Sequence, residues 1–403
     1  MRPLLSIEQY QERILAAIPP PRARAVPLDR AYSCVAARSI AAPGDLPTFA
    51  SSAMDGFAVR SSDLSEASAA APIRLEVVGE VRMGAAATSA VAPGQAVAVP
   101  TGAMMPHGAD TVVPVELCTC EARSVLIPAP SPPARNVRPP GEDLLAGEVL
   151  VDAGRLLEAA DLGALAAAGV GEVEVFPKPT VVVFSTGNEL VEADGTPGPG
   201  QIYESNSFML RALVSRAGGE PVYAGRVPDD PEMLLTALSG SPDGDVLLCS
   251  GGVSAGREDP VKLAFAGTAD VSGVQVAVQP GRPQAFGRQF GKTFFGLPGN
   301  PMASLVSFEL FVRPALQKMR GLPAHVTYLE AVADCTLEAA PHAVRFIPVR
   351  LTGSGALVVA RSTGLRRSNQ LARLARADGL AEIPAGRNLG PGDRVRVLPT
   401  RGG

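Results

Sequence analysis

The residues best suited to chemistry lie in glycine-rich segments in the second half of the chain, each following a short apolar run. Glycines let a ligand approach the backbone closely, and a helix that begins behind such a loop directs N–H groups and a positive dipole end toward an anion. The segments therefore predict a site for phosphate or another oxyanion. They are STGNEL (residues 185–190), SGGVSAGRED (250–259), QPGRP (279–283) and LPGNP (297–301).

Turn geometry alone is the simpler explanation for any one of these segments, because loops commonly contain Gly, Ser and Asn. It explains less well why every loop on one edge of a sheet is enriched in them. No segment has the Lys-Ser/Thr ending of a P-loop, and no GxGxxG opens the region. A nucleotide would therefore have to bind through a motif other than these two.

Carboxylates accompany the glycine-rich segments, at Glu189, Asp229, Asp230 and Asp259. An anionic ligand among carboxylates is electrostatically unfavourable unless a hard cation lies between them. Mg²⁺ takes one or two carboxylates together with phosphate oxygens and water, so the sequence predicts magnesium. Asp230 and Asp259 each also precede a predicted helix, and an N-cap role remains open for both.

The elements that must position these segments lie in residues 178–326. Apolar strand candidates alternate there with helical stretches that begin near Asn206, Asp230, Asp259 and Pro301, which is typical of a parallel, doubly wound sheet. In such a sheet the ligand lies outside the carboxyl ends of the strands, where the loops that follow them meet. The strand candidates are TVVVFS, PVYAGRV, DVLLCS, VQVAVQ and TFFGL.

Three further regions complete the predicted architecture. Residues 1–45 begin with a helix, indicated by a capping-box pattern and apolar residues at helical spacing, and are rejoined by residues 141–177 around an inserted module. That module, residues 46–140, consists of short apolar pieces separated by Gly and Pro and is predicted to be β-rich. Residues 327–403 are predicted to form a small C-terminal β-domain.

Composition narrows the class of protein. The chain has 403 residues, 46% of them hydrophobic, which is enough for several cores, and it contains neither an apolar run long enough to span a membrane nor a signal-peptide pattern. A net charge of −4, 4% aromatic residues and no Trp argue against nucleic acid and favour a small-molecule partner. Five scattered cysteines show no zinc-site spacing and predict reduced thiols. We expect a soluble, cytoplasmic protein.

Further strings extend the pattern beyond the glycine-rich segments. Taken in order, SAMDGFA, PTGAMMPHGADTVV, NVRPPGEDL, STGNEL, SGGVSAGRED, PGRPQAFG and GLPGNPMAS resemble the molybdopterin molybdenumtransferase family of molybdenum-cofactor biosynthesis, to which the E domain of gephyrin is similar. The resemblance spans nearly the whole chain. It implies an α/β multidomain fold, in which a doubly wound domain resembling molybdopterin adenylyltransferase accompanies β-rich inserted and C-terminal domains.

The resemblance also implies a reaction and an assembly. Adenylylated molybdopterin and molybdate would be the substrates, and Mg²⁺ would assist cleavage of the adenylyl phosphoanhydride with release of AMP. The protein would be a homodimer whose active site lies between the α/β domain and a domain of the partner subunit. Other cofactor-biosynthesis proteins are possible partners, whereas nucleic acid and membrane are not expected.

Residue roles follow from the resemblance, motif by motif. Asp55, Thr101 and Asp143 of the inserted module would face the partner's cleft, while Asp259 and then Glu189 are the strongest candidates for holding Mg²⁺ or ordering water. The acidic residues implied in catalysis are Asp259, Glu189, Asp229, Asp230, Asp55 and Asp143. Substrate binding is implied for Thr101, Ser185, Thr186, Gly187, Gly251, Gly252, Ser254, Gln279, Arg282, Pro298, Gly299, Asn300 and Pro301, and in the C-terminal domain for Arg350 and Ser368.

Two departures from the family pattern bear on activity. Asn188 stands where the family usually has an acid, and Gln279 stands where a lysine is usual, although Arg282 keeps a cation able to bind phosphate. A weakened paralogue or a non-catalytic, pterin-binding scaffold of the same fold therefore remains an alternative, as does a generic nucleotide-binding regulator. The choice between molybdate and tungstate also stays open.

Overall fold

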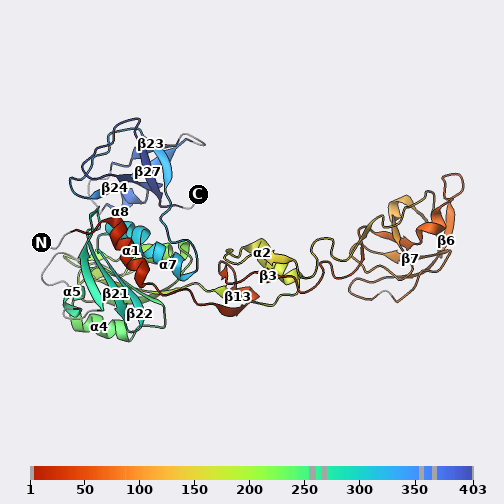
Figure 1. Cartoon of the computed structure of the whole chain (residues 1–403), viewed down its shortest axis with the longest axis horizontal. Helices are drawn as coiled ribbons and strands as arrows, with labels where there is room; N and C mark the ends of the chain where they lie inside the picture. The colour runs from red at the N-terminus through yellow and green to blue at the C-terminus, as the bar shows by residue number, and fades with distance from the viewer. Residues whose placement is uncertain are drawn as a thin grey trace. The chain divides into compact units, whose positions relative to one another are not determined.

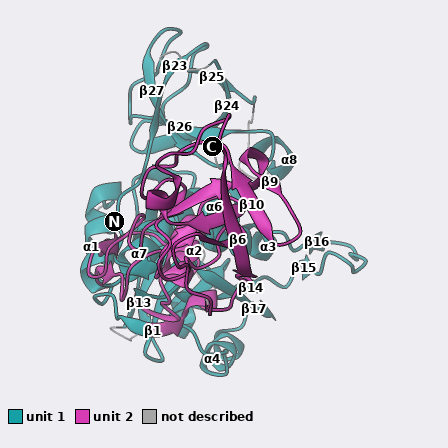
Figure 2. Ribbon diagram, turned by 90° about the vertical axis from the view of Figure 1, so that its right-hand side faces the viewer, with its two compact units in different colours: residues 1–24, 33–37, 175–403 teal, residues 25–32, 38–174 magenta. Residues whose placement is uncertain are grey.

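The computed structural model describes residues 4–86, 88–253, 260–265, 270–353, 358–364 and 370–401. The chain forms two compact units, coloured separately in Figure 2. Unit 1 contains residues 1–24, 33–37 and 175–403, and unit 2 contains residues 25–32 and 38–174. Two units do not resolve four domains, so the predicted domain boundaries stay a prediction. Within the described residues, no helix is both long and apolar enough to cross a membrane.

Unit 2 is built mainly on a six-stranded sheet of order β8-β5-β7-β6-β10-β9, in which only β6 and β7 pair in parallel. Gly56, in the string SAMDGFA, begins β5 where a Cβ would lie 2.1 Å from the carbonyl oxygen of Val113 on β8. Only glycine fits that approach, which explains this part of the motif. The strands are β5 (Gly56–Val59), β6 (Ile73–Glu80), β7 (Gln95–Val99), β8 (Thr111–Pro114), β9 (Thr119–Cys120) and β10 (Ser124–Ile127).

The remaining elements between Arg24 and Phe176 are short. Two-stranded pairs join β11 to β4 and β12 to β3, and a three-stranded sheet has the order β1-β13-β2. These elements are β1 (Arg24–Pro27), η1 (Leu28–Arg30), β2 (Val35–Ala36), β3 (Ile40–Ala41), β4 (Ser51–Ser52), η2 (Ser61–Leu64), η3 (Val115–Leu117), β11 (Val137–Arg138), β12 (Val149–Val151), α2 (Ala159–Ala167) and β13 (Glu172–Phe176).

Unit 1 contains the predicted α/β domain, whose sheet has the order β17-β14-β18-β22-β21-β19. The first four strands are parallel, as predicted, but β21 runs antiparallel to both neighbours. Strand β21 was not predicted from the sequence, because it begins with a proline and contains a glycine, which are both poor strand formers. The strands are β14 (Thr180–Thr186), β17 (Glu220–Val227), β18 (Val246–Ser250), β19 (Val271–Gln275), β21 (Pro283–Gln289) and β22 (Lys292–Leu297).

Helices cover both faces of this sheet, which confirms the doubly wound architecture. Along β14, Val181 and Val183 join one buried cluster with α1, α3 and the α6–α7 segment, whereas Val182 and Phe184 join another with α4 and α5. Figure 1 shows α1 and α7 on the opposite side of the sheet from α4. The helices are α1 (Ile7–Ala17), α3 (Asn206–Arg216), α4 (Pro231–Ser239), α5 (Pro260–Ala264), α6 (Pro301–Ser307), the π-helical turn η4 (Phe308–Val312) and α7 (Arg313–Met319).

The N-terminal helix is part of this core. Ser6 and Gln9 form the predicted capping box of α1, and the Tyr10 ring packs edge-on against Phe311 of η4 with centroids 4.8 Å apart. Pro314 has no N–H to donate to the Leu310 carbonyl, which instead accepts a hydrogen bond of 2.8 Å from the side chain of Gln11. Helix α1 therefore completes the hydrogen bonding of the π-helical turn as well as covering it.

The C-terminal region forms a closed ring of five strands. β24 pairs with β25 and β26, β23 pairs with β25 and β27, and β26 pairs with β27. The predicted small β-domain is thus a barrel, to which β20 adds through parallel pairing with β24. The elements are β20 (Val278–Gln279), β23 (Leu329–Ala333), β24 (Val344–Thr352), β25 (Val359–Ser362), α8 (Leu371–Leu374), β26 (Gly379–Ile383) and β27 (Arg394–Pro399).

The contact between α1 and η4 yields a stability prediction. Replacing Phe311, which is 1% exposed, in Phe311→Ala should lower the free energy of unfolding by about 3–5 kcal/mol, because it leaves a cavity beside Tyr10. Phe290→Ala is the control, since the Phe290 ring is 48% exposed. Guanidinium unfolding followed by circular dichroism measures both, and equal midpoints for the two variants would contradict the packing described.

Candidate active site

A cavity of about 880 Å³ lies at the carboxyl edge of the α/β sheet of unit 1. The loops that follow β14, β18 and β22 open into it, together with the N-termini of α3 and α6. The convergence predicted from the sequence is therefore present for three of the four glycine-rich segments. The predicted residues that line the cavity are Ser185, Thr186, Gly187, Glu189, Asp229, Gly251, Gly252, Pro298, Gly299, Asn300 and Pro301.

The fourth segment, QPGRP, contributes only Pro283 to the lining. Gln279 belongs to β20 and pairs with Arg345 of the C-terminal barrel, so neither Gln279 nor Arg282 lines the cavity. Arg350 lies on β24 of the same barrel, where it donates to the carbonyl oxygen of Arg376 at 3.1 Å. Ser254, Asp259 and Ser368 lie outside the described residues, and Asp55, Thr101 and Asp143 belong to unit 2.

Close backbone contact explains the glycines in the loop after β18. Gly251 has φ of +99°, and a Cβ there would lie 2.5 Å from the carbonyl oxygen of Thr186. A Cβ on Gly299 would lie 3.3 Å from the Gly251 α-carbon, so the loops after β14, β18 and β22 pack backbone against backbone. Their N–H groups are thus held close to one another without intervening side chains.

Two helix N-termini face the cavity, and neither is capped by its own N-cap side chain. The N-cap residues are Ser205 for α3 and Asn300 for α6, and neither side chain accepts a hydrogen bond from its helix. Pro301 at the first position of α6 fixes the backbone there, and the helical segment continues to Met319. In the first turn of α3 the Ser207 N–H is already bonded to the Glu204 carboxylate at 2.8 Å, so the other first-turn N–H groups are the ones that could meet an anion.

Asn206 ties the loops together, which the sequence did not reveal. Its amide nitrogen donates to the Ser250 hydroxyl at 2.8 Å and to the Gly299 carbonyl oxygen at 2.7 Å. The Ser304 hydroxyl donates to the Pro298 carbonyl oxygen and lies 3.3 Å from the Ser250 hydroxyl. These bonds join α3, β18 and α6 around the cavity. Sequence spacing could not find the bonds from Asn206 to Ser250 and Gly299 or the contact between Ser250 and Ser304, because each links residues far apart in the chain.

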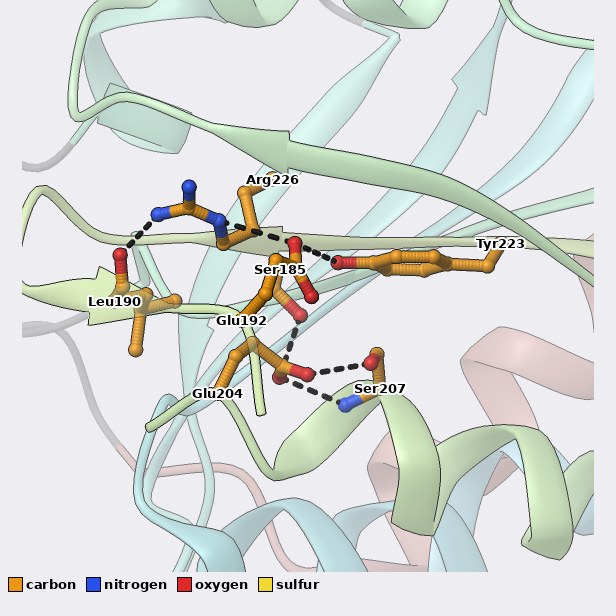
Figure 3. A network of polar contacts seen from close by, with 7 residues as sticks. All are labelled: Ser185, Leu190, Glu192, Glu204, Ser207, Tyr223 and Arg226. Atoms are coloured by element: carbon orange, nitrogen blue, oxygen red, sulfur yellow. Dashed lines mark hydrogen bonds and ion pairs between the residues drawn. The ribbon is translucent and has the colours of Figure 1, made fainter. Parts of the chain in front are cut away.

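A buried carboxylate links the end of β14 to the start of α3 beside the cavity. Glu204 is 2% exposed and accepts from the Ser185 hydroxyl at 2.9 Å and from the Ser207 N–H at 2.8 Å, while the Ser207 hydroxyl bonds its second oxygen. Figure 3 shows this group between the end of β14 and the start of α3. Glu204 was not among the predicted site residues, since a single Glu before a helix gives no signal of burial.

Residues 189–203, which we call the flap, form one wall of the cavity. They contain β15 (Leu190–Val191) and β16 (Ile202–Tyr203), which pair with each other. Arg226 of β17 donates to the Leu190 carbonyl oxygen and bonds Glu192 at 3.1 Å, and the Tyr223 hydroxyl donates to Glu192 at 3.3 Å (Figure 3). Burial, followed by the charges of Glu192 and Glu204, raises the pKa of Tyr223 to about 12. Tyr223 therefore stays protonated and able to donate.

The two adjacent aspartates after β17 have different positions. Asp230 accepts from the N–H of Met233 at 2.8 Å and caps α4, which is the N-cap interpretation left open by the sequence, and it does not line the cavity. Asp229 does line it and exchanges two hydrogen bonds of 3.2 Å with Asn188, one through each residue's backbone N–H. An aspartate at position 188 could accept the same bond from the Asp229 N–H.

The electrostatics of the cavity fit a hard cation. Among the described lining residues there are carboxylates but no Lys, Arg or His. The Glu189 side chain is exposed and makes no hydrogen bond or ion pair with the described part of the chain. No cluster of three or more potential ligands occurs in the described residues, but Mg²⁺ needs only one or two carboxylates beside substrate oxygens and water. Glu189 and Asp229 are suited to that role.

Buried polar atoms around the cavity are incompletely bonded. The Thr186 hydroxyl and the side-chain carbonyl oxygens of Asn206 and Asn300 are buried without a hydrogen-bond partner among the described residues. An unsatisfied buried group costs about 1–3 kcal/mol, so each of these atoms would gain from a partner that a ligand or water supplies. All three residues line the same cavity.

In unit 2 the structure brings together two of the predicted residues. The Thr101 N–H donates to the Asp55 carboxylate at 2.7 Å, and hydrogen bonds from the Thr101 backbone and hydroxyl lower the pKa of Asp55. Both side chains are exposed, as is Asp143. Asp55 is therefore held as an ionised, solvent-facing carboxylate.

Comparison with known proteins agrees with the predicted family. Models named MoeA N-terminal region (domain I and II), probable molybdopterin binding domain, and MoeA C-terminal region (domain IV) match residues 5–169, 182–318 and 330–400. Molybdopterin molybdenumtransferase 2 of Mycobacterium tuberculosis is 39% identical over 94% of this chain and 95% of its own length. The chain belongs to the molybdopterin molybdenumtransferase family. The predicted enzyme class is thereby confirmed.

Other family members and solved structures agree. The molybdopterin molybdenumtransferase of Bacillus subtilis is 33% identical over 91% of this chain and 87% of its own. Two crystal structures of molybdopterin biosynthesis MoeA proteins from Pyrococcus horikoshii are similar, at 32% and 29% identity and TM-scores of 0.79 and 0.71. They cover 99% and 98% of this chain and 100% and 99% of their own. The predicted fold class is confirmed.

The packing at Gly251 yields a prediction with a matched control. Gly251→Ala and Gly225→Ala both place a side chain at a positive φ, +99° and +98° respectively, but only Gly251 faces a backbone oxygen at 2.5 Å, while Gly225 faces open space. Gly251→Ala should therefore lower the free energy of unfolding by a further 1–3 kcal/mol or so. Denaturant unfolding and hydrogen exchange measure the difference. If both variants lost the same stability, the described loop contact would be wrong.

Proposed function

We propose that this protein inserts molybdenum from molybdate into adenylylated molybdopterin, with Mg²⁺-dependent cleavage of the adenylyl phosphoanhydride and release of AMP. The observation that carries the proposal is the cavity itself, where three glycine-rich loops and the N-termini of α3 and α6 converge in a chain of this family. Pterin phosphate, the adenylyl phosphate and molybdate are all oxyanions, which is the chemistry that such a cavity serves.

Backbone N–H groups would carry most of the anion binding. No cationic side chain lines the cavity in the described part of the chain, so the loops after β14, β18 and β22 and the first turns of α3 and α6 are the donors. Because these groups are fixed by the contacts of Gly251 and Asn206, they are oriented before the substrate arrives. Preorganised donors stabilise developing negative charge without reorganisation at the moment of reaction.

Glu189 and Asp259 are the proposed magnesium ligands, with Asp229 beside them. When bound, Mg²⁺ would neutralise charge on the phosphoanhydride oxygens and polarise the bond that breaks. Glu189 extends from the flap into the cavity wall with its carboxylate exposed, and Asn188 fixes the position of Asp229. These carboxylates would hold the cation between themselves and the anionic substrate. The cation would then offset their repulsion of the anion.

A second subunit would complete the site. Asp55, Thr101 and Asp143 are exposed on unit 2, and we propose that they face the cavity of a partner in a homodimer. Gln279, Arg282, Arg350 and Ser368 are proposed to bind molybdate or phosphate from the side of the C-terminal barrel. A cytoplasmic location and delivery of substrate by other cofactor-biosynthesis proteins belong to the same proposal.

The reaction itself is the direct test. Purified protein, adenylylated molybdopterin and Mg²⁺ should release AMP faster when molybdate is added, and Asp259→Ala should abolish that release while leaving the melting temperature unchanged. AMP is measured by chromatography. A protein that binds the pterin but shows no molybdate-stimulated release would be a scaffold, and full activity of Asp259→Ala would remove the role proposed for this residue.

The adjacent aspartates give a sharper test of the metal-binding acids. Asp229→Asn should raise the Mg²⁺ concentration needed for half-maximal AMP release by on the order of 10-fold, because it removes a cavity carboxylate while keeping its shape. Asp230→Asn is the control, since asparagine caps a helix as well as aspartate does and Asp230 lies outside the lining. An unchanged Mg²⁺ requirement in Asp229→Asn would exclude Asp229 from this role.

A further inference from the structure

The flap presents an aromatic side chain to the cavity that the oxyanion chemistry does not use. Tyr203 lines the cavity, is 51% exposed, and is the only aromatic residue among the described lining. Its hydroxyl has no hydrogen-bond partner in the described part of the chain. Ile202 beside it is 56% exposed and lines the cavity as well. Tyr203 and Ile202 thus give the flap side of the cavity an exposed apolar surface.

The flap that carries this surface is fixed at both ends. At one end Arg226 bonds Glu192 and the Leu190 carbonyl oxygen, and at the other Glu204, the residue directly after Tyr203, is held by Ser185 and Ser207 (Figure 3). Backbone hydrogen bonds from Ile202 to Glu189 and from Glu204 to Val191 join the two ends. The position of Tyr203 therefore depends on polar contacts with the sheet rather than on its own burial.

Nearby Phe208 shows that exposure alone does not define this role. The Phe208 ring is also 51% exposed, but the Arg211 guanidinium lies 4.9 Å from its centroid, and Phe208 does not line the cavity. Its packing is explained by the cation–π contact. Tyr203 lies five positions earlier in the sequence and lines the cavity. It has no comparable cation–π contact in the described residues.

The proposed substrate has ring systems as well as oxyanions. Adenylylated molybdopterin carries adenine and a pterin, both flat nitrogen-containing rings, and such rings stack on tyrosine. We propose that Tyr203 is the stacking surface for one of these rings, and that Arg226 is the positioning residue that holds the flap in place for it. This inference rests on the proposed function and adds to it a residue that distinguishes ring-bearing ligands from plain phosphates.

The test compares two ligands that share a phosphate and differ by a ring. Binding of AMP and of ribose 5-phosphate to the full chain is measured by calorimetry, with Tyr203→Ala, Tyr203→Phe and the control Phe208→Ala. Tyr203→Ala should weaken AMP about 10-fold and leave ribose 5-phosphate unchanged, whereas Tyr203→Phe and Phe208→Ala should bind AMP as the unaltered protein does. A parallel series with molybdopterin tests the pterin.

The outcomes separate the two rings. A loss confined to AMP assigns adenine to Tyr203, and a loss confined to molybdopterin assigns the pterin. Unchanged binding of both, or an equal loss for ribose 5-phosphate, would overturn the proposal. Because no molybdate is present and no bond is broken, these measurements succeed or fail independently of AMP release.

Arg226 is tested through the movement of the flap. Arg226→Ala should accelerate hydrogen exchange in residues 189–203 and weaken binding of the ring-bearing ligand while sparing ribose 5-phosphate. Arg226→Lys keeps a charge opposite Glu192 and should restore part of both effects. Faster exchange with unaltered ligand affinity would remove the positioning role.

Discussion

The contact of three backbone loops at Gly251 is the constraint on which the site depends. Parallel strands β14, β18 and β22 end at one edge, and the loop after the middle strand approaches both neighbours because Gly251 has no Cβ toward Thr186 and Gly299 has none toward Gly251. Asn206 and Ser304 then fix the loop after β22 with side-chain hydrogen bonds to the backbone oxygens of Gly299 and Pro298. The backbone N–H groups at this edge are thereby held in place by covalent geometry and packing.

The charge distribution of the cavity follows from this arrangement. Carboxylates line it and cationic side chains do not in the described residues, so the helix N-termini are the source of positive potential there, and the proposed Mg²⁺ would add to it. Asn188 reduces the number of carboxylates relative to the family pattern but keeps the hydrogen bond to the Asp229 backbone. This departure is therefore compatible with the local structure and alters the charge rather than the shape of the wall.

Local patterns in the sequence predicted three of the loops at the cavity and the strands that precede them. The loops STGNEL, SGGVSAGRED and LPGNP were identified because glycine and proline mark backbone requirements, and the alternating apolar runs placed the strands before them. Asn206 and Arg226 were missed because their partners lie far away in sequence, and Glu204 was missed because a single Glu before a helix gives no signal of burial. Only Pro283 of QPGRP reaches the cavity, because the apolar run before this segment ends in β20, which pairs with the barrel.

Hydrogen exchange with AMP and Mg²⁺ added reports on the backbone N–H groups of the cavity themselves. We expect slower exchange in residues 250–253, 298–304 and 205–208, with no change in the β21–β22 turn at Phe290. Protection confined to other parts of the chain, or none at AMP concentrations that saturate the protein, would contradict the assignment of this cavity as the site where the adenylyl phosphate binds.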